Sequence, residues 1–195
     1  MNILLSSKID LDKRNDISIK SDLRLFKFFD KCFNTKNNYL TLFDSSKEHT
    51  IDLIVISGGN DIIQKKIQDK IRYKLTLKCF LFGLNNEIPI LGICYGAQFI
   101  ASYYKFQINK ILNHVGNKHF VYDEQNRNKR LVNSYHNYAI KYKKSNYLKP
   151  LFFDNKNNVE SFEIKNKNII GMMWHPEREK KINSKDTKMI KNLCN

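Results

Sequence analysis

The sequence predicts an α/β fold with an open, largely parallel central sheet flanked by helices. Short apolar runs that suit buried strands alternate with segments of helical periodicity through the first half of the chain. Two of these runs end abruptly in glycine-containing loops. No Pro- or Gly-rich linker and no internal repeat divides the 195 residues. We therefore expect a single domain over residues 1–195.

The N-terminal half supplies the expected parallel strands and their helices. An apolar run at residues 2–6 is typical of a buried first strand. Ser21 and Asp22 are suitable N-cap residues for a first helix. Its apolar residues recur at spacings of three and four: Leu23, Phe26, Phe29 and Phe33. The same periodicities predict strands over residues 39–43, 51–56 and 88–93, and helices over residues 62–84 and 97–103.

The C-terminal half has a different pattern. Beyond Phe106, short apolar stretches are separated by Asn and Lys, which predicts a few added strands. These strands are expected over residues 119–122, 131–134, 159–164 and 169–174, with a last helix over 184–193. Because ligands bind beyond the carboxyl ends of strands in open α/β sheets, we expect the site at loops 57–61 and 94–98.

The composition limits the cellular compartments in which the protein is expected. The N-terminus lacks a basic leader region, and no window approaches the roughly 18 apolar residues of a membrane-spanning helix. The four cysteines show no paired spacing and form no zinc motif with the five histidines. We therefore predict a soluble, cytoplasmic protein with reduced cysteines and no membrane partner.

The net charge of +15 raises the question of a nucleic-acid partner. The basic residues are mostly lysine and are dispersed among asparagines, which is typical of a solvated surface. We therefore expect no nucleic-acid partner. The charge does favour a phosphate-bearing small substrate through long-range attraction.

Gly92-Ile93-Cys94-Tyr95-Gly96 has the form G-x-C-x-G, the thiol counterpart of a nucleophile elbow. In this sharp strand-to-helix turn, side chains two positions before and after the cysteine would collide. The sulfur would lie at a helix N-terminus, which favours the thiolate, and the Tyr95 N–H would point beside it. A buried core cysteine is the alternative, but the flanking strand and helix patterns favour the elbow.

A thiolate nucleophile needs a base, and the base needs an orienting acid. His175 and Glu177 are separated by Pro176 on a segment that we predict to be extended, so both side chains are expected on the same face. Pro176 also biases His175 to an extended conformation. The alternative is a surface His-Pro-Glu turn.

Four motifs together resemble the class I glutamine amidotransferases in identity and order. They are Ile56-Ser57-Gly58-Gly59-Asn60-Asp61, Leu91 to Gln98 around the elbow, Val132-Asn133-Ser134-Tyr135-His136, and Trp174-His175-Pro176-Glu177. The family has a flavodoxin-like α/β fold, and the match spans residues 51–177. Several independent motifs in the right order make coincidence a poor explanation.

The resemblance implies a mechanism that uses no cofactor. Cys94 would attack the γ-carbonyl of a glutamyl group and form a thioester that water hydrolyses. His175 would transfer the proton, Glu177 would orient His175, and the N–H groups of Gly59 and Tyr95 would form the oxyanion hole. Gln98 would contact the glutamyl moiety, and the backbone of Asn133, Ser134 and Tyr135 would hold its amino and carboxylate groups.

The resemblance also points to one branch of the family. Some members pass ammonia to a synthetase, whereas others hydrolyse γ-glutamyl amides alone. Residues 133–140, with the pattern NSxHxxA, and residues 159–163 resemble the second branch. Within it, the resemblance extends to hydrolases of γ-glutamyl-CDP-amidate, which release glutamate and cytidine diphosphoramidate for capsular polysaccharide modification. No motif identifies cytidine, although the basic composition suits an anionic leaving group.

Four residues are candidate contacts to the leaving group: Asn60, Asp61, His136 and Arg24. Each has a simpler interpretation as well. Asp61 suits a helix cap, His136 a satisfied strand residue and Arg24 a surface cation on a helix.

His114 and His119 raise the question of a metal. We expect no metal site, because strand character and Gly116 keep them off one helical face and because no carboxylate partner of the usual kind is near.

Two other functions remain open. One is a glutaminase subunit that supplies ammonia to a partner synthetase. The other is a non-catalytic protein that binds small ligands or nucleic acid on the same scaffold. The sequence leaves the oligomeric state undetermined.

Overall fold

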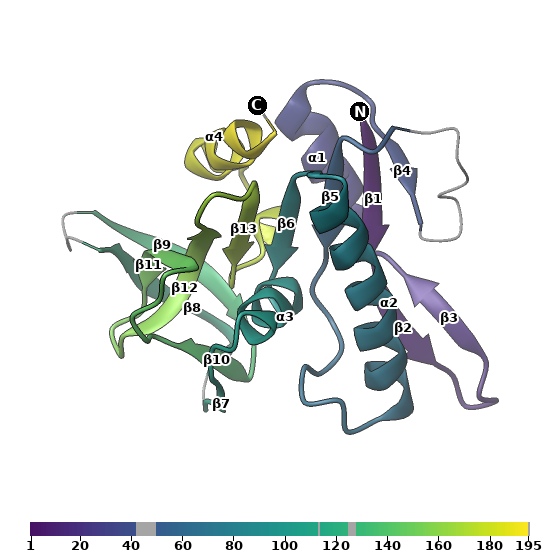
Figure 1. The fold of residues 1–195 in the computed structure, drawn as a ribbon, viewed down its shortest axis with the longest axis horizontal. Helices are drawn as coiled ribbons and strands as arrows, with labels where there is room; N and C mark the ends of the chain where they lie inside the picture. Colours follow the sequence, from purple (N-terminus) through teal and green to yellow (C-terminus); the bar gives the residue numbers. More distant parts are fainter. Residues whose placement is uncertain (42–49, 113, 125–127, 195) are drawn as a thin grey trace.

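The computed structural model describes residues 1–41, 50–112, 114–124 and 128–194. Five strands form the parallel half of its main sheet, with neighbours in the order β4 (Asn38–Leu40), β1 (Asn2–Ser6), β5 (Leu53–Ile56), β6 (Ile90–Ile93) and β13 (Ile169–Met172). Each neighbouring pair is parallel. The predicted α/β class with a parallel central sheet is confirmed (Figure 1).

The antiparallel strands extend the sheet beyond β13. The order continues through β12 (Asn158–Ile164), β11 (Leu148–Phe153), β8 (Val115–Asp123) and β9 (Lys129–Tyr135). In addition, β10 (Tyr138–Lys141) pairs with β12 and with β7 (Ile108–Lys110). In Figure 1 these strands gather on the side of the molecule away from β1 and β4. The expected added strands in the C-terminal half are therefore present.

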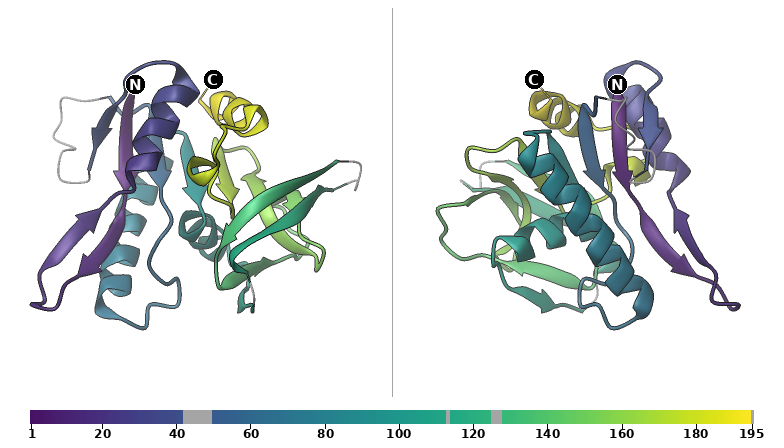
Figure 2. Two further views of the ribbon diagram at one scale, coloured as in Figure 1. Left: turned by 180° about the vertical axis from the view of Figure 1, so that it is seen from behind. Right: turned by 45° about the vertical axis from the view of Figure 1, so that its right-hand side comes forward.

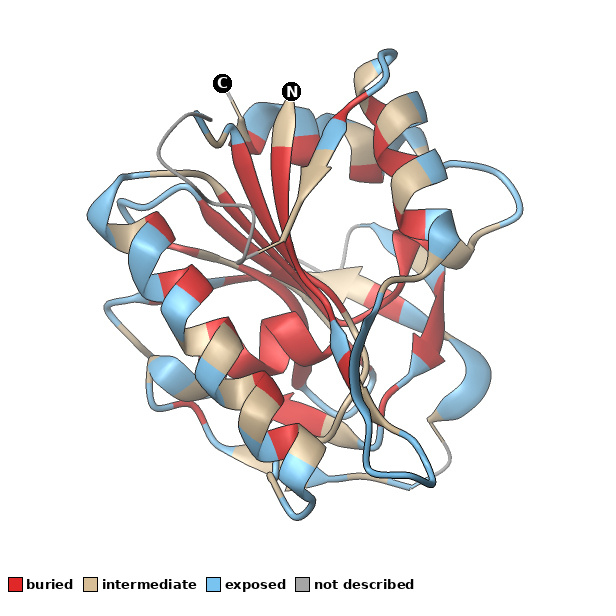
Figure 3. Ribbon diagram, turned by 90° about the vertical axis from the view of Figure 1, so that its right-hand side faces the viewer, coloured by how far each residue is buried: buried red, intermediate tan, exposed pale blue. Residues whose placement is uncertain are grey.

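Helices cover both faces of the parallel half. On one face, α2 (Ile67–Asn85) and α3 (Tyr95–Tyr103) pack on Ile54, Ile56 and Ile90. On the other face, α1 (Leu23–Phe33) and α4 (Ser184–Leu193) pack on the alternate strand residues, such as Val55 and Leu91. This alternation follows from the two-residue period of a strand. The two layers are seen from behind in Figure 2, and Figure 3 shows the buried strands between them.

The first helix begins as predicted but buries a different stripe. The Asp22 side chain accepts a hydrogen bond from the Arg24 N–H and caps the helix. Leu23, which the periodicity placed on the apolar face, is 71% exposed. The buried residues are Leu25, Phe28, Phe29 and Cys32. The buried stripe differs from the predicted one because packing on the sheet decides which face of α1 turns inward. The apolar residue at the first helical position does not decide it.

Several boundaries and strands differ from the sequence prediction. The expected strand over residues 39–43 is β4, and its last two predicted positions lie outside the described residues. The predicted helices 62–84 and 97–103 begin at Ile67 and Tyr95. The sequence prediction missed β7, β10, β11 and the separate hairpin of β2 (Lys8–Leu11) and β3 (Ile17–Lys20). These strands are short or carry exposed residues, so their apolar periodicity is weak.

Among the helices described, none combines the length and the apolar character that a membrane crossing demands.

Candidate active site

The site lies where three neighbouring parallel strands end. β5 leads into the Gly58-Gly59 loop, β6 into Cys94, and β13 into His175. The β13–β6 register places Met172 beside Ile93, so the segments after these residues leave the same edge of the sheet. Glycine loop, thiol and imidazole thus meet at the carboxyl ends of the strands, as the fold class predicts.

Cys94 forms a sharp turn between β6 and α3. Its backbone has φ 52° and ψ −101°, a strained conformation for a residue with a side chain. Its N–H donates to the Met172 carbonyl on β13, and its carbonyl accepts the Gln98 N–H at 3.0 Å. The sulfur therefore sits at the start of α3, where the Tyr95 N–H belongs to the first turn, which has no intrahelical acceptor.

The two glycines of the elbow are required by contact. A Cβ on Gly92 would lie 2.7 Å from the Gly96 carbonyl carbon, and a Cβ on Gly96 would lie 2.1 Å from the Ile56 oxygen. Both distances are to backbone atoms, which cannot rotate away. The steric reason that the sequence suggested for G-x-C-x-G is thus present in the structure.

His175 and Glu177 are hydrogen-bonded, but not on an extended strand. His175 is extended, with φ −106°, whereas Glu177 lies in the short 3-10 helix η1 (Pro176–Arg178). The expectation of one extended segment is therefore wrong, because Pro176 starts a helical turn with its fixed φ. The turn still brings Glu177 Oε1 within 2.7 Å of His175 Nδ1, and both side chains are 3% exposed.

The thiol and the imidazole alter each other's ionisation. Burial of Cys94 opposes the thiolate, but hydrogen bonding and charge from His175 outweigh it, so the pKa of Cys94 is lowered. Burial of His175 opposes its cation, but hydrogen bonds to Cys94 and Glu177 raise the pKa of His175 to about 9. The geometry thus favours a thiolate–imidazolium pair. By contrast, burial raises the pKa of Cys32 and of Cys79 to about 11.

This pair predicts a bell-shaped dependence of activity on pH. As the pH rises through about 9, His175 loses the proton that a leaving group needs, so kcat/KM should fall. As the pH falls through the lowered pKa of Cys94, the thiolate is protonated and kcat/KM should fall again. Alkylation of Cys94 by iodoacetamide should therefore reach half its maximal rate below pH 9. A midpoint above pH 9, like that expected of Cys32 or Cys79, contradicts the pairing.

Gly58 is a residue that sequence reasoning passed over. A Cβ at this position would lie 2.5 Å from His175 Cε1 and 3.2 Å from its Nε2. The imidazole thus packs directly on the backbone of the glycine loop. Its neighbour Gly59 has φ +103°, which favours glycine. The paired glycines were visible in the sequence, but only Gly59 received a role.

Gly58→Ala should lower kcat by about 100-fold, because the added methyl must displace the His175 ring from Cys94 and a shift of about 1 Å has such an effect. Steady-state kinetics and thermal unfolding measure the effect on activity and on stability separately. An exposed neighbour in the following loop, Ile63→Ala, serves as the matched control. Unchanged kcat in Gly58→Ala would show that the ring tolerates the displacement.

Asn133 supports His175 through the backbone. Its Oδ1 accepts the His175 N–H at 2.9 Å, and its Nδ2 donates to the His175 carbonyl at 2.8 Å and to Glu179 Oε1 at 2.7 Å. Its buried side chain is thus used within the protein. Ser134 is also fully buried. Among the described residues, neither lines the pocket at Cys94.

The pocket at Cys94 brings together most of the other predicted residues. Its walls include Gly59, Asn60, Asp61, Tyr95, Gln98, Tyr135, His136 and His175. Gln98 is buried and donates to the Tyr138 carbonyl at 3.0 Å. The ring of Tyr135 meets the His175 ring edge-on at 5.6 Å, and Arg178 lies 4.6 Å above the Tyr135 ring. Arg178, next to the predicted Glu177, was missed.

The weaker candidates have partners of their own. Asn60 exchanges two hydrogen bonds with the backbone of Ile9. Asp61 Oδ1 accepts the Ile63 N–H at 2.9 Å within a turn, and the simpler interpretation of a helix cap is wrong because α2 begins later, with Lys66 as its N-cap. His136 Nδ1 lies 3.0 Å from the Tyr138 carbonyl. Although burial opposes it, contact with Glu160 raises the pKa of His136.

Arg24 lies outside this pocket, in an adjoining basic hollow. We define the basic hollow by its four cationic lining residues, Lys8, Lys20, Arg24 and Arg178. Its acidic lining residues are Asp22 and Glu177. Arg24 is paired with Asp22 at 2.7 Å, as expected of a surface helix cation. Gly59, His175 and Arg178 line both the hollow and the Cys94 pocket, so the two spaces adjoin.

Arg72 on α2 is another residue that sequence reasoning missed. It is 1% exposed, and burial lowers its pKa to about 10. Its guanidinium donates to the Ser57 carbonyl at 3.0 Å and lies 5.1 Å from the Tyr95 ring centroid. It therefore ties the glycine loop to the start of α3. A single arginine in a segment of mixed periodicity gave no sequence signal for this role.

The expectation about His114 and His119 is wrong in one respect. A carboxylate partner is near, because Glu160 on β12 lies with both histidines, and one ligand atom from each of the three falls within 4.8 Å of the others. His119 Nε2 is 3.3 Å from Glu160 Oε2. The partner was overlooked because it is distant in sequence and is brought in by the sheet.

Comparisons with known proteins support the family resemblance and the fold. The model of the family "Glutamine amidotransferase class-I" matches residues 9–194. The chain is 38% identical over 139 residues to the γ-glutamyl-CDP-amidate hydrolase of Campylobacter jejuni, covering 70% of this chain and 68% of that protein. It is 29% identical over 164 residues to the glutamine-hydrolyzing GMP synthase subunit of Methanococcus aeolicus, covering 80% of each. A solved structure from Thermoplasma acidophilum, of a protein assigned as a GMP synthase subunit, has the same fold, with a TM-score of 0.72 at 20% identity over 100% of this chain and 92% of that one.

Proposed function

The chain belongs to the class I glutamine amidotransferase family, and from this premise we propose that it hydrolyses γ-glutamyl-CDP-amidate without a synthetase partner. Its relatives support the broader statement that the chain is a hydrolase of the glutamine amidotransferase class. The products would be glutamate and cytidine diphosphoramidate, a precursor for capsular polysaccharide modification.

The proposed reaction runs in two halves. The Cys94 thiolate attacks the γ-carbonyl carbon, and the carbonyl electrons move to an oxygen held by the N–H groups of Gly59 and Tyr95. The tetrahedral adduct then collapses to a thioester and expels the nitrogen, which takes the proton of His175. Water gives a proton to His175, attacks the thioester and releases glutamate and Cys94. Glu177 holds His175 in orientation and stabilises its cation.

The basic hollow is the observation that carries the choice of substrate. It adjoins the Cys94 pocket at His175, the residue that would protonate the leaving nitrogen. Its four cations are opposed by the lining carboxylates Asp22 and Glu177 and by Asp10, which pairs with both Lys8 and Lys20, so the cations outnumber the carboxylates by one. A diphosphate attached to the leaving nitrogen would be attracted there, whereas the ammonia released from glutamine needs no such surface.

A second candidate function is favoured by the relatives named as GMP synthase subunits. In that case the chain would release ammonia from glutamine for a separate synthetase. The purified full chain distinguishes the two. We expect the isolated chain to turn over γ-glutamyl-CDP-amidate with a kcat/KM at least about 100-fold above that for glutamine, which corresponds to roughly 2.7 kcal/mol of discrimination. Rapid cleavage of glutamine only after a synthetase is added would support the second function instead.

Removing two cations from the basic hollow should weaken the binding of the diphosphate substrate only. Lys8→Ala combined with Lys20→Ala should raise KM for γ-glutamyl-CDP-amidate about tenfold and leave KM for an uncharged γ-glutamyl amide unchanged, because only the diphosphate needs these charges. Lys149→Ala, an exposed lysine paired with Glu163 outside both linings, is the matched control. Equal changes for both substrates would place the diphosphate elsewhere.

A further inference from the structure

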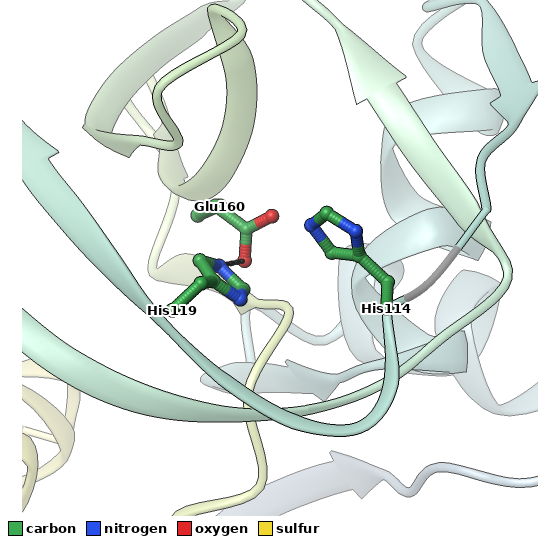
Figure 4. Close-up of side chains that lie close together, drawn as sticks. All are labelled: His114, His119 and Glu160. Atoms are coloured by element: carbon green, nitrogen blue, oxygen red, sulfur yellow. Dashed lines mark ion pairs between the residues drawn. The ribbon is translucent and has the colours of Figure 1, made fainter.

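Behind the Cys94 pocket, three histidines surround one buried carboxylate. His114 precedes β8, His119 lies on β8, His136 joins β9 to β10, and Glu160 lies on β12. The side chains are 13%, 19%, 1% and 1% exposed respectively. In Figure 4, the rings of His114 and His119 face the carboxylate of Glu160 from two sides. Four groups that bind metals well are thus withdrawn from water together.

Several polar atoms of this cluster lack a well-formed hydrogen bond. Within the part of the chain that the structure describes, the buried atoms without a well-formed hydrogen bond include His114 Nε2, both ring nitrogens of His119, His136 Nε2 and Glu160 Oε2. Their ion-pair contacts, with Glu160 and, for His114 Nε2, with Asp154 at 3.9 Å, are long or poorly aligned. Buried polar atoms are almost always satisfied, so several unpaired atoms that converge on one point indicate a ligand. Glu160 is the strongest sign, because its carboxylate is 1% exposed and its ion partners among the described residues are histidines.

The histidine tautomers suit a metal. The Tyr138 carbonyl can only accept a hydrogen bond, so His136 Nδ1 at 3.0 Å carries the proton. Its Nε2 faces Glu160 Oε1 at 3.7 Å, so His136 is a partner of the carboxylate and not one of the proposed ligands. His114 Nδ1 lies in the same relation to the Leu112 carbonyl, at 3.5 Å. Metal-binding histidines commonly have one nitrogen fixed by a carbonyl in this way while the other binds the ion.

We propose that His114, His119 and Glu160 bind a divalent transition-metal ion of the zinc class, with His136 at the edge of the site. Imidazole and carboxylate are usual zinc ligands, with bonds of about 2.0–2.2 Å, which places ligand atoms about 3.3 Å apart in a tetrahedron. The three ligand atoms lie within 4.8 Å of one another, so binding would draw them together by side-chain rotation. The ion would also compensate the buried charge of Glu160.

The site would have a structural role for the pocket wall. His136 lines the Cys94 pocket on one side and meets Glu160 on the other. A bound ion would therefore fix β8, β12 and the loop that carries His136 relative to one another. Cys94, His175 and Glu177 form a separate group, so metal binding and the hydrolytic reaction can be tested independently.

Metal content and thermal unfolding of the untagged full chain test the proposal. After incubation with Zn²⁺ and dialysis, we expect about one equivalent of zinc and a rise in Tm of roughly 5 °C. His119→Ala and Glu160→Gln should each lower the bound zinc at least tenfold and abolish the rise in Tm. Two controls should retain both effects: Phe120→Ala, an exposed neighbour on the same strand, and Cys94→Ala.

If the variants do not fold, measurements on the wild-type chain alone still test the proposal. Co²⁺ in place of zinc should give the intense visible absorption of a four-coordinate site, and anomalous scattering from crystals should place the ion between His114, His119 and Glu160. Less than one tenth of an equivalent of zinc in the wild type overturns the proposal. So does zinc that is lost in Cys94→Ala but retained in Glu160→Gln, which would place the ion at the hydrolytic site.

Discussion

Replacing Cys94 with alanine is expected to lower kcat/KM for γ-glutamyl amides by at least about 10⁴-fold, because no other group can form the thioester. The substitution removes a sulfur that is 7% exposed and leaves the turn between β6 and α3 in place. The loss should therefore appear in kcat and not in the stability of the fold. Steady-state kinetics and thermal unfolding of both proteins measure the two effects.

Labelling provides the control for this prediction. A glutamine-like diazoketone should modify wild-type protein at Cys94 alone, since the pKa of this thiol is lowered whereas burial raises the pKa of Cys32, Cys79 and Cys194. Cys32→Ala should be labelled and active like the wild type. If Cys94→Ala is labelled to the same extent as wild type, or retains its turnover, the nucleophile is not Cys94.

Replacing His175 with alanine should lower kcat/KM by about 10³- to 10⁴-fold. This ring both stabilises the thiolate and supplies the proton for the leaving nitrogen. Glu177→Gln should cause a smaller loss, of about 10²-fold, because the imidazole can still act when it is poorly oriented. Kinetics of both variants at several pH values check the order of the effects.

The pH dependence separates the two roles. In Glu177→Gln the alkaline limb should move below pH 9, since the hydrogen bond that His175 donates to Glu177 helps to raise the pKa of His175. In His175→Ala the alkylation of Cys94 should require a higher pH than in the wild type. Ile63→Ala, an exposed residue outside the linings of both the Cys94 pocket and the basic hollow, is the control. A larger loss in Glu177→Gln than in His175→Ala would contradict the assigned roles.

Local sequence patterns were sufficient to predict elements whose structure depends on residues close together in the chain. The apolar runs at β1, β5 and β6 are buried on both faces and were found from composition alone. The elbow at Cys94 and the steric reason for it were both predicted, because its two glycines lie in one five-residue motif. Strands β2, β3 and β7 were missed because exposed side chains interrupt their apolar pattern.

Contacts between distant segments could not be predicted in the same way. Gly58 carries no side chain, so nothing in its local sequence indicates that its missing Cβ makes room for His175. Arg72 acts through a carbonyl 15 residues earlier, at Ser57. Glu160 reaches His119 only because β8 and β12 belong to one sheet.

The sequence by itself determined the α/β class, the elbow at Cys94 and the family, since each depends on residues that are close together in the chain or on motifs in a fixed order. Only the tertiary structure decided that the basic hollow adjoins His175, that Gly58 touches the imidazole and that three histidines meet Glu160. The physical reason is that strand order and helix packing, and not sequence spacing, set the distances between side chains from separate elements.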